Sequence, residues 1–250
     1  MKAMLLAAGR GERMRPLTDT TPKPLLRAGG KALIVWHLER LRRAGFRQII
    51  INHAWLGALV EATLAREAPE TLDITYSPEG EPLETAGGIA NALPLFASSD
   101  ESFLVINSDI WCDFDPGRAR TIAQQMSASN ALAHLVMVPN PAQHPHGDFA
   151  LMQGRVHDEA IAHPSRAAAS QTGSHPAPRL TFSGIGIYRP SLFGGVVPGS
   201  KAKLAPLLRA AMRTGQVSGE LHSGAWEDIG TPERLAALDT QLRTQPRALQ

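Results

Sequence analysis

The residues best suited to chemistry lie near the N-terminus, in the segment AAGRGERMRPLTDTTPKPL at residues 7–25, directly after a short apolar run. This segment contains Gly9, Gly11, Arg13 and Lys23 and only two acids. Glycine lets backbone N–H groups approach an anion closely, and arginine and lysine supply the charge that holds it. The segment therefore predicts a loop that binds a polyphosphate.

Two common phosphate-binding patterns do not fit this loop. In the dinucleotide fingerprint, a third glycine would stand where this chain has Met14, and the second strand would end in an acid rather than in Asn52. In a P-loop, a Ser or Thr would follow the lysine, but here Pro24 follows Lys23. These differences disfavour an NAD-dependent dehydrogenase. A glycine-rich turn without function would explain the glycines, but it would not explain Arg13 and Lys23.

The elements that must position this loop follow from the alternation of apolar runs and amphipathic stretches. We expect strands at residues 1–7, 48–52, 72–77 and 103–109, and helices at residues 33–44, 57–66 and 86–93. Short apolar strands separated by helices are typical of a parallel sheet covered on both faces. Ligands of such sheets bind beyond the carboxyl ends of the strands, which is where the loop and Asp109 lie.

The second half of the chain is less regular. We expect strands at residues 131–138 and 179–189, and helices at residues 203–213 and 232–242. Thr231 is the expected N-cap of the closing helix. Residues 158–178 are rich in Ala, Ser, His and Pro and predict a flexible loop rather than a domain. We therefore expect a single domain over residues 1–250.

Composition limits the class of protein. The chain has 250 residues, 43% of them hydrophobic and 19% charged, as in an ordinary globular domain. Its net charge of +2 gives no reason to expect a nucleic-acid partner. The single cysteine, Cys112, excludes an intrachain disulfide, and no apolar run reaches the roughly 18 residues that span a bilayer. We expect a cytoplasmic protein without a membrane partner.

The N-terminal segment resembles the signature of the sugar-1-phosphate nucleotidyltransferases, which carry a G-x-G-x-R loop, then P-x-T and a lysine in a KPL context. The resemblance places Arg13 and Lys23 in the phosphate-binding and catalytic positions. It places Ala7, Gly9 and Gly11 in the backbone that holds the base and the phosphates. The implied fold is α/β: a three-layer Rossmann-like nucleotidyltransferase fold with a mostly parallel central sheet, helices on both faces and a small sugar-binding lobe.

Three further matches follow in the family's order. SPEGEPLETAGGI, at residues 77–89, resembles the base-recognition segment. The resemblance places Glu79, Gly80 and Thr85 beside the base, and it uses Gly88 to let ribose or sugar approach. A turn followed by a helix N-terminus would explain the same composition without a ligand.

The other two matches carry carboxylates. NSD at residues 107–109 resembles the family's N-G-D, with Ser108 in place of glycine, and EDIGTPERL at residues 227–235 resembles D-x-G-T-x-E/D-x-L. The resemblance implies that Asp109 and Asp228 bind Mg²⁺, which prefers oxygen ligands and retains several waters. Taken alone, an Asp at a strand end is more simply a turn former.

Sugar-binding positions are implied by the segments GDF and FSGI. They contain Gly147, Asp148 and Ser183, and Asn107 from NSD joins them. The family needs a cation near the sugar phosphate, for which Lys203 is the candidate. A solvated helix start would also explain that lysine.

Two histidines and two further cations are assigned no firm role. His144 and His146 flank a proline, and we interpret them as part of a solvated loop rather than as a metal pair. Arg189 and Lys201 join Lys203 as candidates to face a carboxylate on the sugar.

The resemblance covers essentially the whole chain and implies a reaction. A sugar 1-phosphate oxygen attacks the α-phosphorus of UTP in line, pyrophosphate leaves, and Mg²⁺ assists. Because a phosphate monoester has a second pKa of about 6, the nucleophile needs no general base. Residues 1–115 are expected mainly to bind nucleotide, and residues 116–250 mainly to bind sugar.

The identity of the sugar is the finer question. INHAWLG and KLAPLLRAAM resemble segments of the family members that act on N-acetylmuramate 1-phosphate, and this resemblance implies a role in peptidoglycan recycling. Transfer of a guanylyl group from GTP to mannose 1-phosphate is an alternative. A catalytically inactive nucleotide-sensing subunit is another, although Lys23, Asp109 and Asp228 are all present. Both a monomer and a small homo-oligomer remain open.

Overall fold

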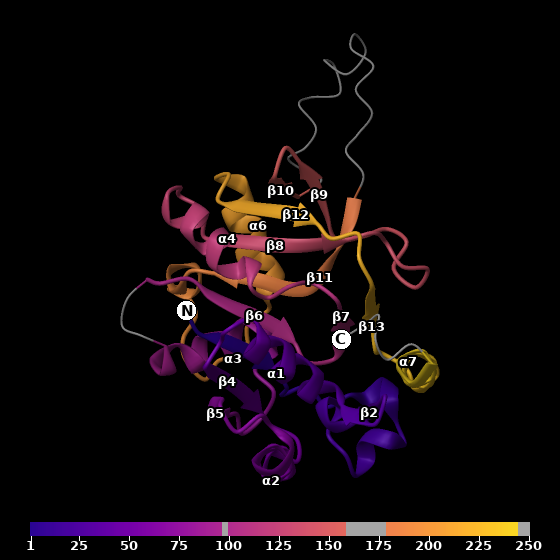
Figure 1. The fold of residues 1–250 in the computed structure, drawn as a ribbon. Helices are drawn as coiled ribbons and strands as arrows, with labels where there is room; N and C mark the ends of the chain where they lie inside the picture. The colour runs from indigo at the N-terminus through magenta and orange to yellow at the C-terminus, as the bar shows by residue number, and fades with distance from the viewer. Residues whose placement is uncertain (97–99, 159–178, 245–250) are drawn as a thin grey trace.

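A nine-stranded sheet forms the centre of the computed structural model, which describes residues 1–96, 100–158 and 179–244 (Figure 1). The strand order is β5-β4-β1-β6-β11-β8-β12-β10-β9. Only β10 and β11 run against the direction of the other seven strands. The strands are β1 (Ala3–Leu6), β4 (Gln48–His53), β5 (Asp73–Pro78), β6 (Phe103–Asn107), β8 (Ala133–Val138), β9 (Phe149–Met152), β10 (Arg155–His157), β11 (Arg179–Tyr188) and β12 (Val217–Leu221).

Helices cover both faces of this sheet. One face carries α1 (Leu33–Arg43), α2 (Gly57–Glu67) and α4 (Arg118–Ser127), and the other carries α3 (Glu84–Ala92) and α6 (Leu204–Arg213). Within β1, Ala3 and Leu5 belong to the first hydrophobic cluster and Met4 to the second. This alternation is the two-residue period of a strand. Burial on both sides explains why β1 is apolar throughout. The expected three-layer α/β fold is confirmed.

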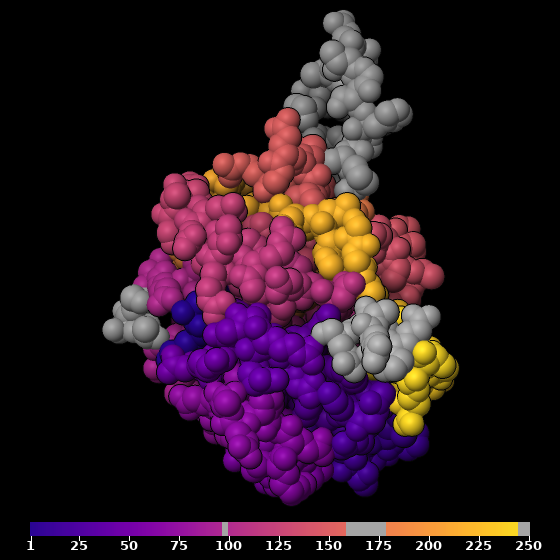
Figure 2. Space-filling model, in the orientation of Figure 1, coloured from indigo at the N-terminus to yellow at the C-terminus, as the bar shows by residue number. Residues whose placement is uncertain are grey.

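A third hydrophobic cluster ties the two ends of the chain together. It joins Met14 and Trp36 of the N-terminal region to Ile229 and to Leu238 of α7 (Pro232–Thr244). Figure 2 shows α7, in yellow, against the indigo N-terminal segment. Two short ladders border this cluster, β2 (Arg27–Ala28) with β3 (Lys31–Ala32) and β7 (Ile110–Cys112) with β13 (Trp226–Asp228). The loop at residues 7–25, called the signature loop below, therefore packs through Met14 against the C-terminal helix.

The signature loop itself is built from three 3-10 turns. These are η1 (Glu12–Met14), η2 (Leu17–Asp19) and η3 (Lys23–Leu25), and two further turns lie elsewhere, η4 (Leu93–Leu95) and η5 (Pro190–Phe193). The expected strands and helices are all present with small shifts of their ends, whereas α4, β9, β10 and β12 were not expected.

Thr231 caps α7 as predicted. Its hydroxyl accepts a bond from the Arg234 amide at 3.4 Å, and its carbonyl accepts one from the Leu235 amide at 3.1 Å. Of the expected flexible loop 158–178, residues 159–178 lie outside the described residues. Within the described ranges, no helix is both long and apolar enough to cross a bilayer.

Candidate active site

A cleft of about 730 Å³ opens beyond the carboxyl ends of β1, β4, β5 and β6. A second cavity of about 400 Å³ adjoins it, and Arg13, Asn107 and Asp109 line both. Ten of the expected site residues line the larger cleft: Ala7, Gly9, Gly11, Arg13, Lys23, Glu79, Gly80, Thr85, Asn107 and Asp109. Open parallel sheets hold their ligands at this edge, and the cleft brings these expected site residues together there.

Lys23 is the buried cation of this cleft. It opens the turn η3 between two prolines, and its Nζ donates to Oδ2 of Asp109 at 2.6 Å. Gly11 leaves space for the Lys23 side chain. A Cβ at Gly11 would lie 3.0 Å from Cβ of Lys23 and 3.0 Å from Cγ2 of Thr18. With φ at +65°, Gly11 also has a backbone conformation that L side chains rarely adopt. The glycine thus allows Lys23 to point at the end of β6.

Other cations lie at the surface of the larger cleft. Arg13 is exposed and makes no hydrogen bond or ion pair with any residue that the structure describes. Arg10 stacks over the Trp55 ring, with its guanidinium carbon 5.0 Å from the ring centre. Lys201 forms an exposed 3.7 Å ion pair with Glu81. Arg13 is therefore available to an anionic ligand.

The two carboxylates expected to bind metal lie on neighbouring segments of one ladder. Asp228 is opposite Ile110 in the β13–β7 pair, and the Ile229 amide donates to the Asp109 carbonyl at 3.0 Å. Both aspartates line the second cavity. Arg234 donates through Nη1 to Oδ2 and to the carbonyl of Asp228, at 2.7 Å each. The ladder thus brings together two residues that are far apart in the sequence.

This donor set fits a hard divalent cation. Mg²⁺ prefers carboxylate oxygens together with water and phosphate oxygens. Asp109 and Asp228 supply carboxylates, and each one has an oxygen held by a cation, Lys23 or Arg234. These two cations partly offset the negative charge that two neighbouring carboxylates would otherwise concentrate at the ladder.

His37 is hydrogen-bonded to the β7–β13 ladder. Its Nε2 donates to the Ile110 carbonyl at 2.8 Å. Burial lowers the pKa of His37 from 6.5 to about 4, so the ring is neutral at physiological pH. A neutral imidazole can donate this bond without placing a second charge beside Asp109.

The segment expected to lie beside the base, residues 77–89, is held by buried side chains. Asn52 Oδ1 accepts from the Ala7 amide at 2.9 Å, and Asn52 Nδ2 donates to Glu79 Oε1 at 2.7 Å. Gly88 lies directly behind this pair, because a Cβ there would lie 2.6 Å from Glu79 Oε1 and 2.8 Å from Asn52 Nδ2. Gly88 does not line the larger cleft. The absence of a side chain at Gly88 leaves room for Glu79 and Asn52.

The second cavity holds only part of the expected sugar-binding set. Ser183 lines it, whereas Gly147 and Asp148 lie behind its wall. Asp148 accepts from the Phe182 amide at 2.8 Å through Oδ2 and from His144 Nε2 at 3.1 Å through Oδ1. His144, expected in a solvated loop, thus lines the cavity beside Phe182.

Lys203 differs most from its expected place. It is the exposed N-cap residue of α6 and lines neither cavity, whereas Lys201 lines the larger cleft. Arg189 bonds to the Met126 carbonyl at 2.6 Å and lies outside both cavities. Among the residues that the structure describes, the cationic side chains that line the second cavity are Arg13 and Arg234.

Several site residues were not predicted from the sequence. Asn52 directly follows the three isoleucines of β4 and is buried, which is a signal because a buried amide needs partners. Arg234 is the third residue of α7, where the helix dipole disfavours a cation, and this position signals a local anion. Arg10 and Trp55 carried no comparable signal.

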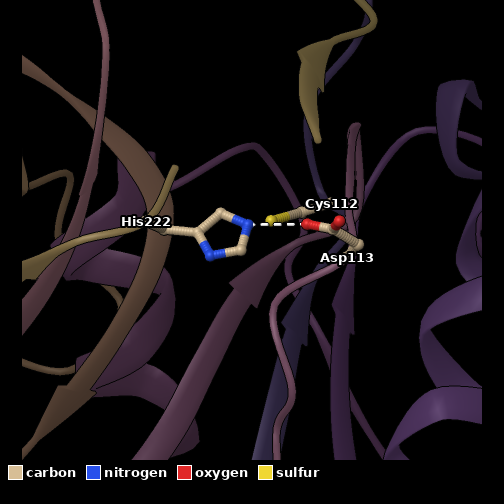
Figure 3. A group of neighbouring side chains, drawn as sticks. All are labelled: Cys112, Asp113 and His222. Atoms are coloured by element: carbon tan, nitrogen blue, oxygen red, sulfur yellow. Dashed lines mark hydrogen bonds and ion pairs between the residues drawn. The ribbon is translucent and has the colours of Figure 1, made fainter. Parts of the chain in front are cut away.

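A separate group of polar side chains lies at the far end of the β7–β13 ladder, where Cys112, Asp113 and His222 approach within 4.8 Å of one another (Figure 3). His222 Nε2 donates to Asp113 Oδ1 at 2.7 Å. Burial raises the pKa of the Cys112 thiol to about 11, so the thiol is protonated. The Gly224 backbone packs against the imidazole–carboxylate pair. The group thus fastens the segment after β12 to the end of β7.

Known proteins resemble the chain over its whole length. The sequence model of the family described as Nucleotidyl transferase matches residues 2–245. The N-acetylmuramate alpha-1-phosphate uridylyltransferase of Neisseria meningitidis serogroup B is 50% identical over 236 residues, 94% of this chain and 95% of that protein. The mannose-1-phosphate guanylyltransferase catalytic subunit beta of Danio rerio is 29% identical over 93% of this chain and 62% of its own length. The crystal structure of HddC from Yersinia pseudotuberculosis complexed with GMP-PN has the same fold, with a TM-score of 0.73, 20% identity and coverage of 96% of this chain and 99% of that one.

Proposed function

Because the chain belongs to the nucleotidyl transferase family, we propose that it transfers the uridylyl group of UTP to N-acetylmuramate 1-phosphate, giving the UDP-sugar and pyrophosphate. The 50% identity to the Neisseria uridylyltransferase, over nearly the full length of both chains, is the observation that carries this choice of substrates. Such a reaction belongs to peptidoglycan recycling in the cytoplasm. We propose that the protein acts as a monomer or as a small homo-oligomer.

The larger cleft suits the nucleotide. Residues 79–85 form one wall, where a base can lie, and residues 7–13 form another, where backbone amides and Arg13 can contact phosphates. Lys23 lies between this wall and the second cavity, at the end of β6. A triphosphate bound along the loop would bring its phosphates towards both cations.

The adjoining cavity suits the sugar phosphate. Arg13 lines both spaces, so it can contact the phosphates of the two substrates. N-acetylmuramate differs from the commoner hexosamines by a lactyl carboxylate, which needs a cation or hydrogen-bond donor. Arg234 lines this cavity, and it replaces Arg189 and Lys203 as the candidate for that contact.

Repulsion between two anionic substrates is the barrier that this site must lower. The sugar phosphate is largely dianionic at neutral pH, because its second pKa is about 6, so no side chain needs to remove a proton. Lys23 and Arg13 place fixed positive charge where the phosphates meet. Asp109 and Asp228 are the residues that would hold Mg²⁺. When bound, the ion neutralises phosphate charge and helps to align the reacting oxygens.

The test is pyrophosphate release from a panel of substrate pairs. We expect turnover with UTP and N-acetylmuramate 1-phosphate, and much weaker turnover with glucose 1-phosphate or N-acetylglucosamine 1-phosphate. Turnover chiefly with GTP and mannose 1-phosphate would favour a guanylyltransferase, the activity named for the 29% identical relative. No release with any pair in the presence of Mg²⁺ would favour an inactive nucleotide-binding subunit.

A further inference from the structure

A buried chain of hydrogen bonds crosses the floor of the larger cleft. It runs from the Ala7 amide to Asn52 Oδ1 at 2.9 Å, from Asn52 Nδ2 to Glu79 Oε1 at 2.7 Å, and from the Leu83 amide to Glu79 Oε2 at 2.9 Å. Asn52 is 3% exposed and Glu79 is 6% exposed. Two side chains thus connect the start of the signature loop to the base-recognition segment.

The direction of every donor in this chain is fixed. The amides of Ala7 and Leu83 can only donate, and the Glu79 carboxylate can only accept. Asn52 satisfies both neighbours in one orientation, with its oxygen towards Ala7 and its nitrogen towards Glu79. The reversed amide would place donor against donor and oxygen against carboxylate. The chemistry therefore requires one donor and one acceptor at position 52.

The pair also has little room to move. Gly88 packs against both side chains, and a single added Cβ there would overlap them. The Glu79 amide donates to the His53 carbonyl at 2.8 Å, which fixes the backbone at the end of β5 to the end of β4. The ends of β4 and β5 and the backbone of α3 at Gly88 therefore fix the positions of Asn52 and Glu79.

We propose that Asn52 and Glu79 are a positioning pair that sets the separation between the phosphate-binding loop and the base-binding segment, and so determines the affinity for the nucleoside triphosphate. This inference rests on the proposed nucleotidyltransferase function. Glu79 has each carboxylate oxygen committed to a bond within the protein. Glu79 therefore acts mainly by fixing the geometry of residues 79–85, and Asn52 acts by holding Glu79 in place.

Exchanging the polarity of the pair tests this role. Asn52→Asp places two carboxylates against each other, and Glu79→Gln disturbs the bonds at Asn52 and Leu83. In the double variant, the carboxylate at position 52 can accept from the Ala7 amide and from the side-chain amide at position 79, whose oxygen in turn accepts from the Leu83 amide. The double variant has the net charge of the wild type. Asn91→Asp is the matched control, since Asn91 lies on α3 with only a 3.4 Å bond to the Ser77 hydroxyl.

Steady-state kinetics and calorimetric UTP binding give the readout. We expect each single variant to raise KM and Kd for UTP by about tenfold or more, the factor that corresponds to losing a hydrogen bond to a charged group. KM for the sugar phosphate should stay near the wild-type value. The double variant should recover most of the UTP affinity, and Asn91→Asp should not change it.

Two results would overturn the proposal: folded single variants with wild-type UTP affinity, or a folded double variant that stays as weak as the single variants. If the single variants unfold, the double variant alone decides between recovery and loss. The calorimetric arm also separates this inference from the proposed function. A wild-type protein that binds UTP without releasing pyrophosphate would contradict the activity, but the same variants would still test the pair.

Discussion

The Nζ atom of Lys23 lies 2.6 Å from Oδ2 of Asp109, although 86 positions separate the two residues in the sequence. The lysine side chain is 9% exposed and the aspartate side chain 37% exposed, so the pair is partly shielded from water. The ion pair links the cation of the loop to the carboxylate at the end of β6. Replacing either residue leaves the other charge partly buried without its partner.

Replacing Lys23 should abolish most activity. Lys23→Met keeps much of the apolar stem but removes the charge at the position where we propose that the phosphates meet, and loss of one such preorganised charge lowers kcat by about 100-fold or more. Circular dichroism should show a folded protein. Asp109→Asn should have a similar effect on kcat. Near-normal turnover in either variant would contradict the assigned roles.

Gly9 and Gly11 should respond differently to alanine. A Cβ at Gly11 meets Lys23 and Thr18 with φ at +65°, so Gly11→Ala should lower the free energy of unfolding by about 1–3 kcal/mol. A Cβ at Gly9 has no described heavy atom within 4 Å, so Gly9→Ala should leave the stability unchanged. Any loss of UTP affinity in Gly9→Ala then reports the approach of the ligand to that backbone. Urea unfolding and UTP titration measure the two effects, and equal destabilisation of both variants would count against this reading.

Arg234→Ala should impair catalysis more than it impairs folding. Arg234 holds both the carboxylate and the carbonyl of Asp228, and its loss frees Asp228 to turn away from the second cavity. We expect kcat to fall by about tenfold, the effect of about 1.4 kcal/mol. Arg243→Ala removes a surface pair with Asp239 on the same helix and serves as the control. Equal kinetics for the two variants would remove the role given to Arg234.

Stability should fall in mild acid because of two buried histidines. Burial lowers the pKa of His37 and of His134 from 6.5 to about 4, so between these values the unfolded chain binds protons that the folded chain does not. The free energy of unfolding should therefore be flat above pH 6.5 and decrease towards pH 4, by at most about 1.4 kcal/mol per pH unit for each histidine.

Variants of single histidines test the source of this slope. His37→Gln should make it shallower in urea titrations between pH 7.5 and 4.5, and exposed His146→Gln should leave it unchanged. An unchanged slope in His37→Gln would show that His37 is protonated in the folded protein.

The fold was predictable where the chain buries apolar residues with a clear period. β1 and β6 read as strands because nearly every residue is apolar, and β4 because of its three consecutive isoleucines; both faces are indeed covered. α4 was missed because its buried stripe is only Ala119, Ile122 and Met126 among polar residues. β10 and β12 owe their form to pairing with neighbouring strands, which a short local sequence does not encode.

The types of residue in the candidate site could be predicted from the sequence, but the hydrogen bonds between them could not. Glycine, lysine and aspartate at strand ends indicated a phosphate site, and Lys23 and Asp109 lie together in it. The bond between Asn52 and Glu79 joins residues 27 positions apart, and only the parallel register of β4 and β5 brings them into contact. Lys203 was expected in the site from its type and position, but it lines neither cavity, whereas Lys201, two residues earlier, lines the larger cleft.

The cluster that joins Met14 to α7 has a consequence for biosynthesis. As the chain leaves the ribosome, the loop around Met14 emerges first, but Ile229 and Leu238 of its apolar cluster come more than 200 positions later. The complete cluster therefore cannot form on a partly translated chain. Its last members are added only when the helix that begins at Pro232 has been made.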